Sequence, residues 1–331
     1  MKLLKLVPDN TNIDFVRLRG WAFGLTLLLS VLAVGITVYK GLNLGVDFEG
    51  GLMIEERFAQ TPDLDRVRAV VDAQGVGEAS LQQFGDPRTI TIRLPVQRGG
   101  DEGATNAAVR KVEGALDKAF PGAEFRRYST VSGKVSGELI RNGVLAVVLA
   151  IVGIGLFAIF RFEWQFGVST VVAIVHDLLM TLGFFALTQF EFDLNIVAAV
   201  LTIIGYSIND KIVIDDRIRE NMRRYRKMDM GALIDLSVNE TLPRTVMTSV
   251  TVLLALGSLL LFGGHVLRGF AAAMMLGIVV GTYSSIYVSS SLLVVLGLRP
   301  ENFDRKAANS LASGAERVQR REGQPGEGKA K

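Results

Sequence analysis

Six long apolar stretches dominate the pattern of hydrophobic and polar positions along the chain. A helix that crosses the roughly 30 Å hydrocarbon core of a bilayer needs about 20 mostly apolar residues. The stretches that meet this requirement are 20–39, 139–160, 164–188, 194–214, 244–263 and 269–298. The last would be about 45 Å long as a helix, so we expect it to tilt or to begin with an interfacial piece. The pattern predicts a polytopic α-helical membrane protein with six transmembrane helices.

Residues 40–138, between the first two apolar stretches, have the pattern of a small α/β domain. The dipeptide Thr61-Pro62 favours a helix start, with the hydroxyl of Thr61 as its cap, and Gly75 favours a stop. A second helix is expected over 105–120, where apolar residues recur at helical spacing. Strands are expected at 52–58, 79–84, 89–94 and 124–131. The resulting βαββαβ order is that of a ferredoxin-like unit. No catalytic cluster accompanies it, so the domain is expected to bind or to act as a lever.

The distribution of lysine and arginine predicts the topology. Basic residues precede the first apolar stretch in 1–19, and they recur in the helical loop 215–243 and in the tail 299–331. Basic loops stay in the cytoplasm, so both termini are expected inside and the α/β domain is expected to be exported. The basic loop serves either as a partner surface or as a topology signal that also contacts anionic lipid. We expect the tail to be disordered.

The first apolar stretch resembles a secretory signal peptide, because Lys2, Lys5, Arg17 and Arg19 precede it. Its apolar core is longer than that of a signal peptide, and no small-x-small cleavage site follows it. We therefore expect an uncleaved membrane anchor.

Composition excludes several classes of function. The 331 residues are 49% hydrophobic and 21% charged, with a net charge of +3, which implies no nucleic-acid partner. The chain has no cysteine, so disulfides and thiolate metal sites are excluded. Its two histidines, His176 and His265, are far apart in the sequence. We expect neither a metal nor a cofactor.

The segment GYSINDKIVIDD (205–216) places charges at the end of an apolar stretch. An ionisable group at the centre of a membrane helix costs about 2.5–3.5 kcal/mol. Asp210 is about 7 Å past the middle of its helix at 1.5 Å per residue, and it shares a face with Ser207. Asn209 adds a further polar group. Lys211 either pairs with Asp215 at i, i+4 or extends to the membrane surface. We expect Lys211, Asp215 and Asp216 to mark where the helix leaves the membrane, and we assign Lys211 no transport role.

A second polar stripe begins at Arg244 and continues through Thr248, Thr251, Ala255 and Ser258 at helical spacing. Arg244 and Asp210 are expected at similar depth and are predicted to pair inside the bundle. A buried carboxylate that alternates between pairing with an arginine and holding a proton can act as a proton relay. The alternative is a static ion pair that fixes helix packing.

Asp177, beside His176, belongs to a third stripe with Thr170, Ala173 and Thr181. All three stripes are expected to face one another, because lipid penalises exposed polar groups. Asp177 is therefore a further candidate of the proton pathway. The alternative is that it serves packing and that His176 only bonds a neighbouring helix.

The last apolar stretch repeats small residues every four positions, including a GxxxG at Gly277 and Gly281. Small residues let two helix backbones approach closely. This pattern predicts tight helix packing.

Several motifs together resemble the SecF members of the SecD/SecF family, which belongs to the RND superfamily. They are GVDFEGG (45–51), FRFEW (160–164), HD (176–177), GYSIND (205–210), DRIREN (216–221) and SSIYVSS (284–290). The resemblance runs from about residue 17 to 298, with the motifs in the family's order. The family motif after the first helix is represented by Gly45, Asp47, Phe48, Gly50 and Gly51.

The resemblance implies an accessory subunit of the Sec protein translocase in the bacterial inner membrane. With a SecD-like partner beside the SecYEG translocon, it would use the proton gradient to complete preprotein transport after the ATP-driven step of SecA. It implies no enzymatic activity and no cofactor beyond the transported protons. Asp210 and Arg244 match the family's proton-pathway residues. Lys211 stands where the family often has a small hydroxyl residue, and Asp215 where it is often uncharged.

Two other functions fit the same apolar pattern. One is half of an RND-type exporter of small molecules or lipids, although the exported domain is small and shows no signature of a large apolar pocket. The other is a purely structural subunit that stabilises its partner.

Overall fold

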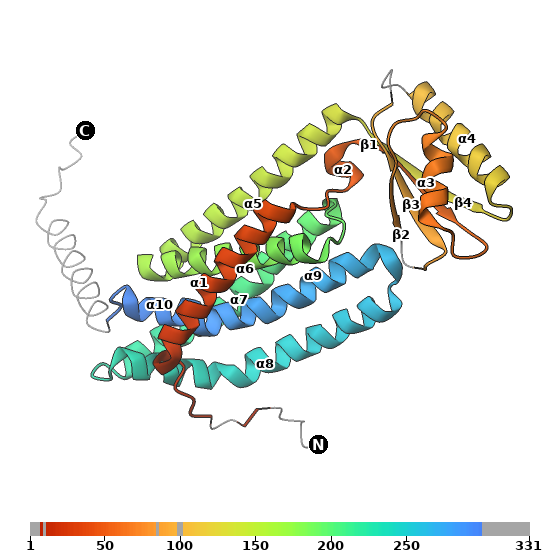
Figure 1. Ribbon diagram of the computed structural model, residues 1–331. Helices are drawn as coiled ribbons and strands as arrows, with labels where there is room; N and C mark the ends of the chain where they lie inside the picture. Colours follow the sequence, from red (N-terminus) through yellow and green to blue (C-terminus); the bar gives the residue numbers. More distant parts are fainter. Residues whose placement is uncertain (1–6, 9–10, 84–85, 98–101, 300–331) are drawn as a thin grey trace, which may run out of the picture.

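The computed structural model describes residues 7–8, 11–83, 86–97 and 102–299. A bundle of long helices carries a small α/β domain at one end, which we call the domain end, and the opposite end is the far end (Figure 1). The N-terminal helix and the following chain run from the bundle into the domain, and α5 returns from the domain to the bundle. Residues 300–331 of the predicted tail 299–331 lie outside the described residues, as do residues 1–6.

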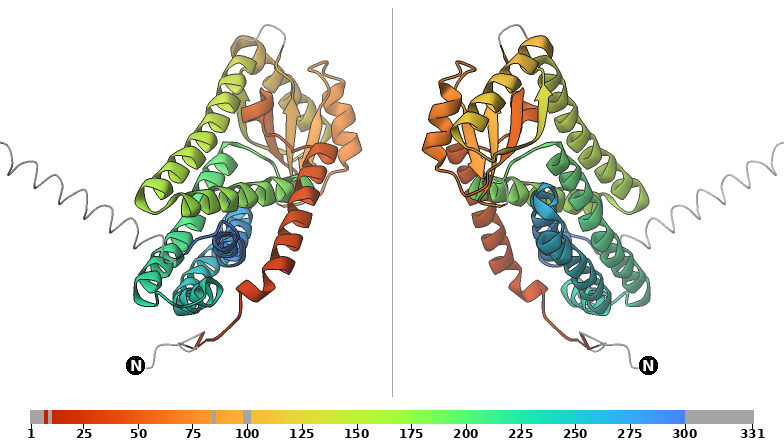
Figure 2. Two further views of the ribbon diagram at one scale, coloured as in Figure 1. Left: turned by 90° about the vertical axis from the view of Figure 1, so that its left-hand side faces the viewer. Right: turned by 90° about the vertical axis from the view of Figure 1, so that its right-hand side faces the viewer.

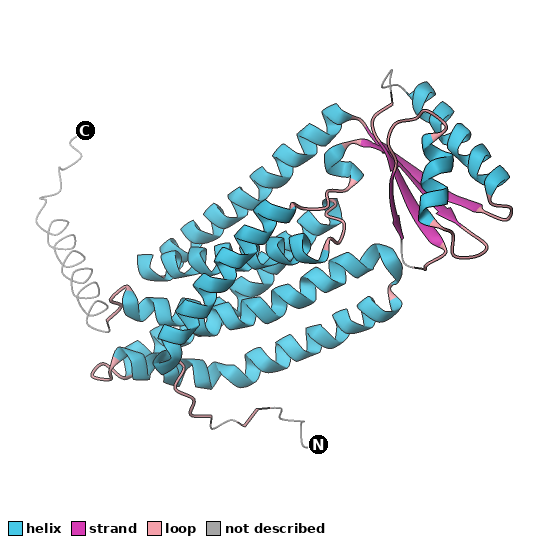
Figure 3. Cartoon of the chain, in the orientation of Figure 1, coloured by secondary structure: helices cyan, strands magenta, loops and turns pink. Residues whose placement is uncertain are grey.

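The α/β domain is a four-stranded antiparallel sheet with the order β2-β3-β1-β4. Its elements are β1 (Gly51–Arg57), α3 (Leu64–Asp72), β2 (Ser80–Gln83), β3 (Thr89–Leu94), α4 (Glu102–Ala119) and β4 (Glu124–Val131). Both helices cover one face of the sheet (Figure 3). The core lies between the sheet and the two helices. It contains the apolar residues that occur at every second position along the strands and at helical spacing along the helices, as the sequence predicts. The ferredoxin-like arrangement is confirmed.

One helix start in this domain differs from the expectation. The helix begins at Leu64, and its N-cap is Asp63, whose carboxylate accepts a hydrogen bond from the Asp65 amide at 3.0 Å. Thr61 therefore lies before the helix. Aspartate caps a helix at least as well as threonine, and Asp63 directly precedes the first helical residue.

Among the described residues, six helices are long and apolar enough to cross a membrane, as predicted. They are α1 (Arg19–Lys40), which continues a short turn η1 (Val16–Leu18), α5 (Gly133–Arg161), α6 (Trp164–Thr188), α7 (Leu194–Arg224), α8 (Met230–Phe262) and a final helix in three parts. The three parts are α9 (Gly264–Tyr283), the π-helical η2 (Ser284–Ser289) and α10 (Ser290–Val295). The most buried of the six are α6, α7 and the final helix. The two views of Figure 2 show α1 and α5 on opposite flanks of the bundle, each packed against α6.

The helices α7 and α8 extend well beyond the predicted apolar stretches. α7 continues to Arg224, ten residues past the predicted end at 214, and α8 begins at Met230, before the predicted start at 244. The predicted loop 215–243 is therefore a helical hairpin with a short turn. Ile218 and Met222 on α7 share an apolar core with Leu233 and Val238 on α8. An amphipathic face continues the helices past the membrane-length run, because it can pack against its partner instead of lipid.

The small residues of the final helix pack against α7. A Cβ added at Gly277 would collide with Ile203, and one added at Gly281 would lie 3.0 Å from Cβ of Ser207. The GxxxG therefore brings the backbone of α9 against α7 at the height of Ser207, where the polar groups of the bundle begin.

Candidate functional site

Asp177, in the middle of α6, is the centre of a buried polar cluster. Ser207 on α7 donates a hydrogen bond from Oγ to Oδ2 of Asp177 at 2.6 Å, and Ser284 on η2 donates to the same oxygen at 3.0 Å. Nδ1 of His176 lies 3.1 Å from Oδ1 of Asp177. All four residues are buried. Three helices thus converge on one carboxylate, with both of its oxygens engaged.

His176 has one ring nitrogen without a partner. Its Nε2 is buried and makes no hydrogen bond with any described residue. The ring lies 6.3 Å from the ring of Tyr283, whose hydroxyl donates to the carbonyl of Ala22 on α1 at 3.1 Å. Histidine can carry a proton on either nitrogen, so this side chain extends the polar cluster from Asp177 toward α1.

Asp210 is the second buried carboxylate, one turn beyond Ser207 on the same face of α7. It is 4% exposed, and its Oδ2 has no hydrogen-bond partner among the described residues. A buried carboxylate oxygen without a partner is costly in its ionised form. Ser207 is next to both acids, because it donates to Asp177 on α6 and precedes Asp210 on α7 by three residues.

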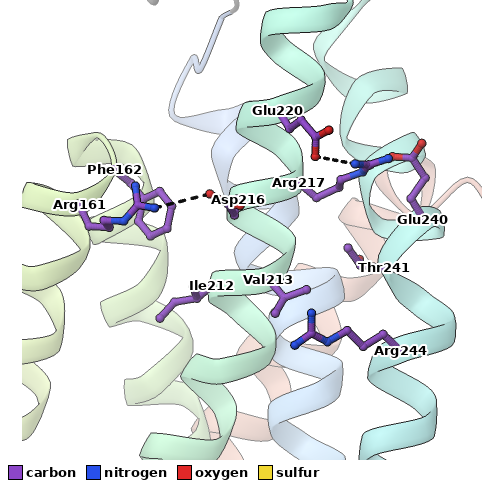
Figure 4. A pocket seen from close by; sticks show the side chains of 10 residues that line it. All are labelled: Arg161, Phe162, Ile212, Val213, Asp216, Arg217, Glu220, Glu240, Thr241 and Arg244. Carbon is purple, nitrogen blue, oxygen red and sulfur yellow. Dashed lines mark hydrogen bonds and ion pairs between the residues drawn. The ribbon is translucent and has the colours of Figure 1, made fainter.

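The predicted ion pair between Asp210 and Arg244 is not formed. Arg244 is exposed and lines a pocket of about 460 Å³ together with residues of α7 and α8. In Figure 4 its guanidinium extends from α8 toward Ile212 and Val213 of α7. Arg244 therefore approaches α7 just past the turn that carries Asp210, and it does so from the surface rather than from the interior.

The stripe that begins at Arg244 does not face the interior, contrary to the prediction. Thr251 and Ser258 are exposed and Thr248 is half-buried, and each donates to the carbonyl four residues earlier in its own helix, at 2.7–3.1 Å. The buried polar residues of α8 are instead Ser237, Asn239, Thr241, Thr245 and Ser249. Helical spacing identifies residues that share a face, but the neighbouring helices decide which face is covered. Asn209 is likewise exposed and does not join the buried site.

A hydroxyl set connects α7, α8 and α9 through Ser249. The hydroxyl of Tyr206 donates to Oγ of Ser249 at 3.4 Å, and Oγ of Ser249 lies 3.0 Å from Oγ1 of Thr282. Sequence spacing did not single out these residues, because each belongs to a different helix.

Lys211 forms a buried ion pair with Asp215. Nζ of Lys211 lies 2.5 and 2.7 Å from the two carboxylate oxygens of Asp215, and both side chains are buried. The ammonium also lies 5.8 Å from the ring centroid of Phe166. The i, i+4 pairing follows the prediction, whereas extension of Lys211 to the surface is wrong. Among the three charged residues only Asp216 is exposed, and their place at the membrane boundary stays a prediction.

The motif GVDFEGG connects the α/β domain to the bundle through several contacts. It includes the short helix α2 (Val46–Glu49). Oδ2 of Asp47 accepts a hydrogen bond from the amide of Leu194, the first residue of α7, at 3.1 Å, and the amide of Gly45 donates to the carbonyl of Phe192 at 2.9 Å. Phe48 is buried against Phe192 with ring centroids 5.9 Å apart, and its carbonyl accepts from the hydroxyl of Ser136 on α5.

Both glycines that end the motif have positive φ angles, which favour glycine. Gly50 has a φ of 73° and Gly51 a φ of 116°, in the region that side chains rarely adopt. A Cβ at Gly51 would overlap the carbonyl oxygen of Leu94 on β3, and one at Gly50 would lie 3.3 Å from Cα of Gly133. The pair turns the chain sharply from α2 into β1 while α5 starts alongside.

A second contact joins the domain to the bundle. Nη2 of Arg93 on β3 lies 2.8 Å from Oε2 of Glu191 in the α6–α7 connection, and Nη1 of Arg93 donates to Oδ1 of Asn43 at 3.0 Å. The two side chains are largely buried. The domain thus touches the start of α7, whose other half carries Ser207 and Asp210.

The described residues contain no group of three histidine, aspartate or glutamate side chains that could hold a metal ion. The polar groups of the bundle are suited to exchanging protons, because carboxylates, an imidazole and hydroxyls all donate and accept them.

Comparisons with known proteins identify the relatives of this chain. Residues 111–299 match the family model described as protein export membrane protein SecD/SecF, C-terminal, and residues 40–61 match the model of the SecD/SecF GG motif. The chain belongs to the SecD/SecF family. The resemblance inferred from the motifs is therefore confirmed.

Relatives within the SecD/SecF family match almost end to end. The protein translocase subunit SecF of Cereibacter sphaeroides is 43% identical over 301 residues, covering 89% of this chain and 93% of the relative. The protein translocase subunit SecF of Rickettsia akari is 40% identical, covering 90% of this chain and 96% of the relative.

Solved SecDF structures share the fold. SecDF from Thermus thermophilus, titled a translocon-associated membrane protein, is 37% identical with a TM-score of 0.79 over 88% of this chain. A SecDF in a super-membrane-facing form is 36% identical with a TM-score of 0.64 over 92% of this chain. The chain spans 39% and 40% of the length of these two SecDF chains.

Proposed function

We propose that this chain is an accessory subunit of the Sec protein translocase that uses a proton gradient to help complete preprotein transport. The family and the names of its SecF relatives support the translocase role. The observation that carries the proton step is the carboxylate of Asp210, which is buried in a membrane-spanning helix with one oxygen unpartnered. Such a group is stable when it holds a proton and unstable when it is ionised without a cation nearby.

Arg244 is the cation that can stabilise the ionised form. It extends from α8 toward α7 at Ile212 and Val213, next to the turn of Asp210. Loss of the proton from Asp210 would draw Arg244 inward, and protonation would release it. The proton state of one carboxylate is thereby coupled to the relative position of α7 and α8. Thr248 lies one turn from Arg244 on α8, so it would move together with Arg244.

The Asp177 cluster extends the pathway into the bundle. Ser207 can pass a proton between Asp177 and the Asp210 side of α7, because its hydroxyl both donates and accepts. His176, with Nε2 unpartnered, is a further acceptor beside Asp177. The proposal thus gives Ser207 a relay role and Asp177 a storage role, and it requires no cofactor and no enzymatic step.

The partner in this proposal is a SecD-like subunit. The two solved SecDF chains match this chain over only 39% and 40% of their own length, which supports a SecD-like counterpart to their remaining part. Arg244, at the head of the exposed stripe of α8, would be costly in lipid, and a SecD-like helix against it would remove that cost. Both termini then lie in the cytoplasm of a bacterium and the α/β domain faces outward, beside the SecYEG translocon and its preprotein clients.

The test uses inverted membrane vesicles that contain this chain with its SecD-like partner. Completion of preprotein translocation is measured after ATP is removed, with and without a proton gradient. For Asp210→Asn we expect the gradient-dependent part to fall to the level seen without a gradient, because asparagine keeps the shape of the side chain but cannot exchange a proton. Protein level and partner co-purification are expected to stay normal.

Asp216→Asn is the matched control, since it removes an exposed carboxylate from the same helix. It is expected to retain gradient-dependent completion. Unchanged completion in Asp210→Asn would contradict the proton step and favour the structural alternative, in which Asp210 serves helix packing. An equal loss in both variants would point to a general effect of charge on α7.

A further inference from the structure

Four arginines surround one pocket at the far end of the bundle. Arg161 ends α5, and Arg219, Arg223 and Arg224 lie on the last turns of α7. Together with Asp216 and Glu220 they line a pocket of about 480 Å³. The function proposed above assigns no role to this pocket, which is separate from the Asp177 cluster and from Asp210.

Aromatic contacts hold two of these cations close together. The guanidinium carbons of Arg161 and Arg219 lie 5.2 and 5.1 Å from the ring centroid of Phe162. Nη1 of Arg219 also donates to the carbonyl of Arg161 at 3.4 Å. Stacking on an aromatic ring orients a planar guanidinium, so like charges are brought together in fixed positions.

The two carboxylates that line the pocket, together with Glu163 near Arg219, do not balance its four arginines. Glu220 accepts a hydrogen bond from Nη1 of Arg217 at 2.5 Å, and Arg217 lies outside this pocket. Asp216 is 3.9 Å from Nη2 of Arg161, at the limit of an ion pair. Figure 4 shows Glu220 directed toward Arg217 and Asp216 directed toward Arg161. The pocket therefore retains a positive excess that suits an anion.

The position of the pocket indicates the source of that anion. Phe160 and Trp164 flank Arg161 in the sequence and are 85% and 53% exposed. Leu156 and Phe157, one turn earlier on α5, are exposed as well, as expected for a helix in lipid. Exposed aromatic residues at the end of a membrane helix lie at the level of the lipid headgroups. The arginines are thus at the depth where phospholipid phosphates are found.

We propose that this pocket binds the phosphate of an anionic phospholipid headgroup between α5 and α7. Guanidinium groups match a phosphate through paired N–H donors, and basic pockets between helices at a membrane surface are suited to anionic lipids. The lipid would hold the end of α5 against the end of α7, and it would relieve the repulsion among the four arginines.

The test measures lipid binding to the full chain purified in detergent with its SecD-like partner. The probe is fluorescent phosphatidylglycerol, with fluorescent phosphatidylcholine as the zwitterionic comparison. Arg223→Gln/Arg224→Gln removes two exposed cations from the pocket wall. We expect this variant to bind phosphatidylglycerol at least tenfold more weakly than the wild type. Phosphatidylcholine is expected to bind the wild type as weakly as the variant.

Arg226→Gln/Lys227→Gln is the matched control, because it removes the same charge from the adjacent turn outside the pocket. It is expected to change binding less than twofold. Equal weakening by both pairs would mean general surface attraction and would overturn the site. Displacement of the lipid by glycerol phosphate at comparable concentration would assign the pocket to a soluble phosphate and would overturn the lipid. Arg219→Lys, which keeps the charge but loses the planar fork, is expected to weaken binding; its thermal unfolding is measured alongside, because Arg219 also stacks on Phe162 and donates to the carbonyl of Arg161.

Discussion

Three buried aspartates in this bundle have three different environments. Asp177 accepts from two serine hydroxyls and contacts His176, Asp215 is paired with Lys211, and Asp210 keeps an oxygen without a partner. A carboxylate whose oxygens are fully engaged is stable where it is, whereas an unpartnered one gains from any change that brings a proton or a cation. Asp210 is therefore the acid best suited to switching, although all three are buried.

A further buried carboxylate belongs to the α/β domain. Glu56 on β1 is 0% exposed, and neither of its oxygens has a hydrogen-bond partner among the described residues. Its neighbours on α4 are the acids Asp117 and Glu113. Burial, followed by the repulsion from Asp117 and then Glu113, raises the pKa of Glu56 from 4.5 to about 7.

This shift predicts how the stability of the domain depends on pH. Because the pKa of Glu56 is raised in the folded state, its stabilising contribution is complete below the unfolded pKa and is lost as the pH rises through about 7. The loss is about 3 kcal/mol, since one pKa unit is worth about 1.4 kcal/mol. In Glu56→Gln this pH dependence is expected to disappear. Hydrogen exchange of β1 and α4 in the full chain, corrected for intrinsic rates between pH 5 and 8.5, measures it.

Glu55→Gln serves as the control, because Glu55 points to the opposite face of the sheet and pairs with Arg127 at 2.8 Å. It is expected to keep the wild-type pH dependence. A wild-type protein whose exchange protection in β1 does not change between pH 5 and 8.5 would contradict a buried acid that titrates near neutrality.

At the scale of elements, the contact between α7 and α9 sets the geometry of the polar cluster. Gly277 and Gly281 let α9 approach α7 at Ile203 and Ser207. Just beyond them the final helix becomes π-helical, and Ser284 at its start reaches Asp177. The close approach of α9 to α7 therefore brings the start of the π-helical segment, where Ser284 lies, to Asp177.

Substitution of Gly277 by valine is expected to separate α9 from α7. Extra methyl groups in a packed interface cost about 1–3 kcal/mol, and here they would also move Ser284 away from Asp177. Gly257→Ala on α8 is the control, since no atom lies within 4 Å of a Cβ added there, and it is expected to be neutral or slightly stabilising. Thermal unfolding of the purified complex compares the two. Equal unfolding temperatures for Gly277→Val and the wild type would mean that the close contact is not required.

At the scale of the whole molecule, the α/β domain and the bundle meet at the start of α7. Asp47 accepts from the first amide of α7, and Arg93 pairs with Glu191 just before it. The same helix carries Ser207 and Asp210 farther along. A shift of α7 would thus move the α/β domain through these two contacts. They provide a mechanical connection between the membrane site and the α/β domain.

Reversal of one charge at this junction is expected to uncouple the two parts. Arg93→Glu places two acids together in a largely buried position, which breaks a buried pair at a cost of about 3–5 kcal/mol. We expect loss of gradient-dependent translocation with a normal level of protein. The double variant Arg93→Glu/Glu191→Arg restores opposite charges and is expected to recover part of the activity. A double variant no better than the single one would contradict the role of this pair.

The sequence by itself determined the elements of the molecule. Apolar length predicted six membrane helices and alternation predicted the four strands, because both signals depend on whether each residue meets water, lipid or a core. It also singled out Asp210, since a carboxylate in an apolar helix is costly whatever its neighbours are. The predicted roles of Asp210 and Arg244 in proton transfer stay predictions.

The tertiary structure decided which polar groups meet. The sequence did not indicate that Ser284 joins Asp177 or that Arg244 and Asn209 are exposed, because the rotation of each helix is set by packing against its neighbours. Lys211 is a second example of burial that local sequence did not predict. Its spacing to Asp215 allowed an ion pair, but only the cover provided by α6 and the other helices keeps that pair out of water. Contacts between residues far apart in the chain are a property of the packed bundle, and local patterns contain no information about them.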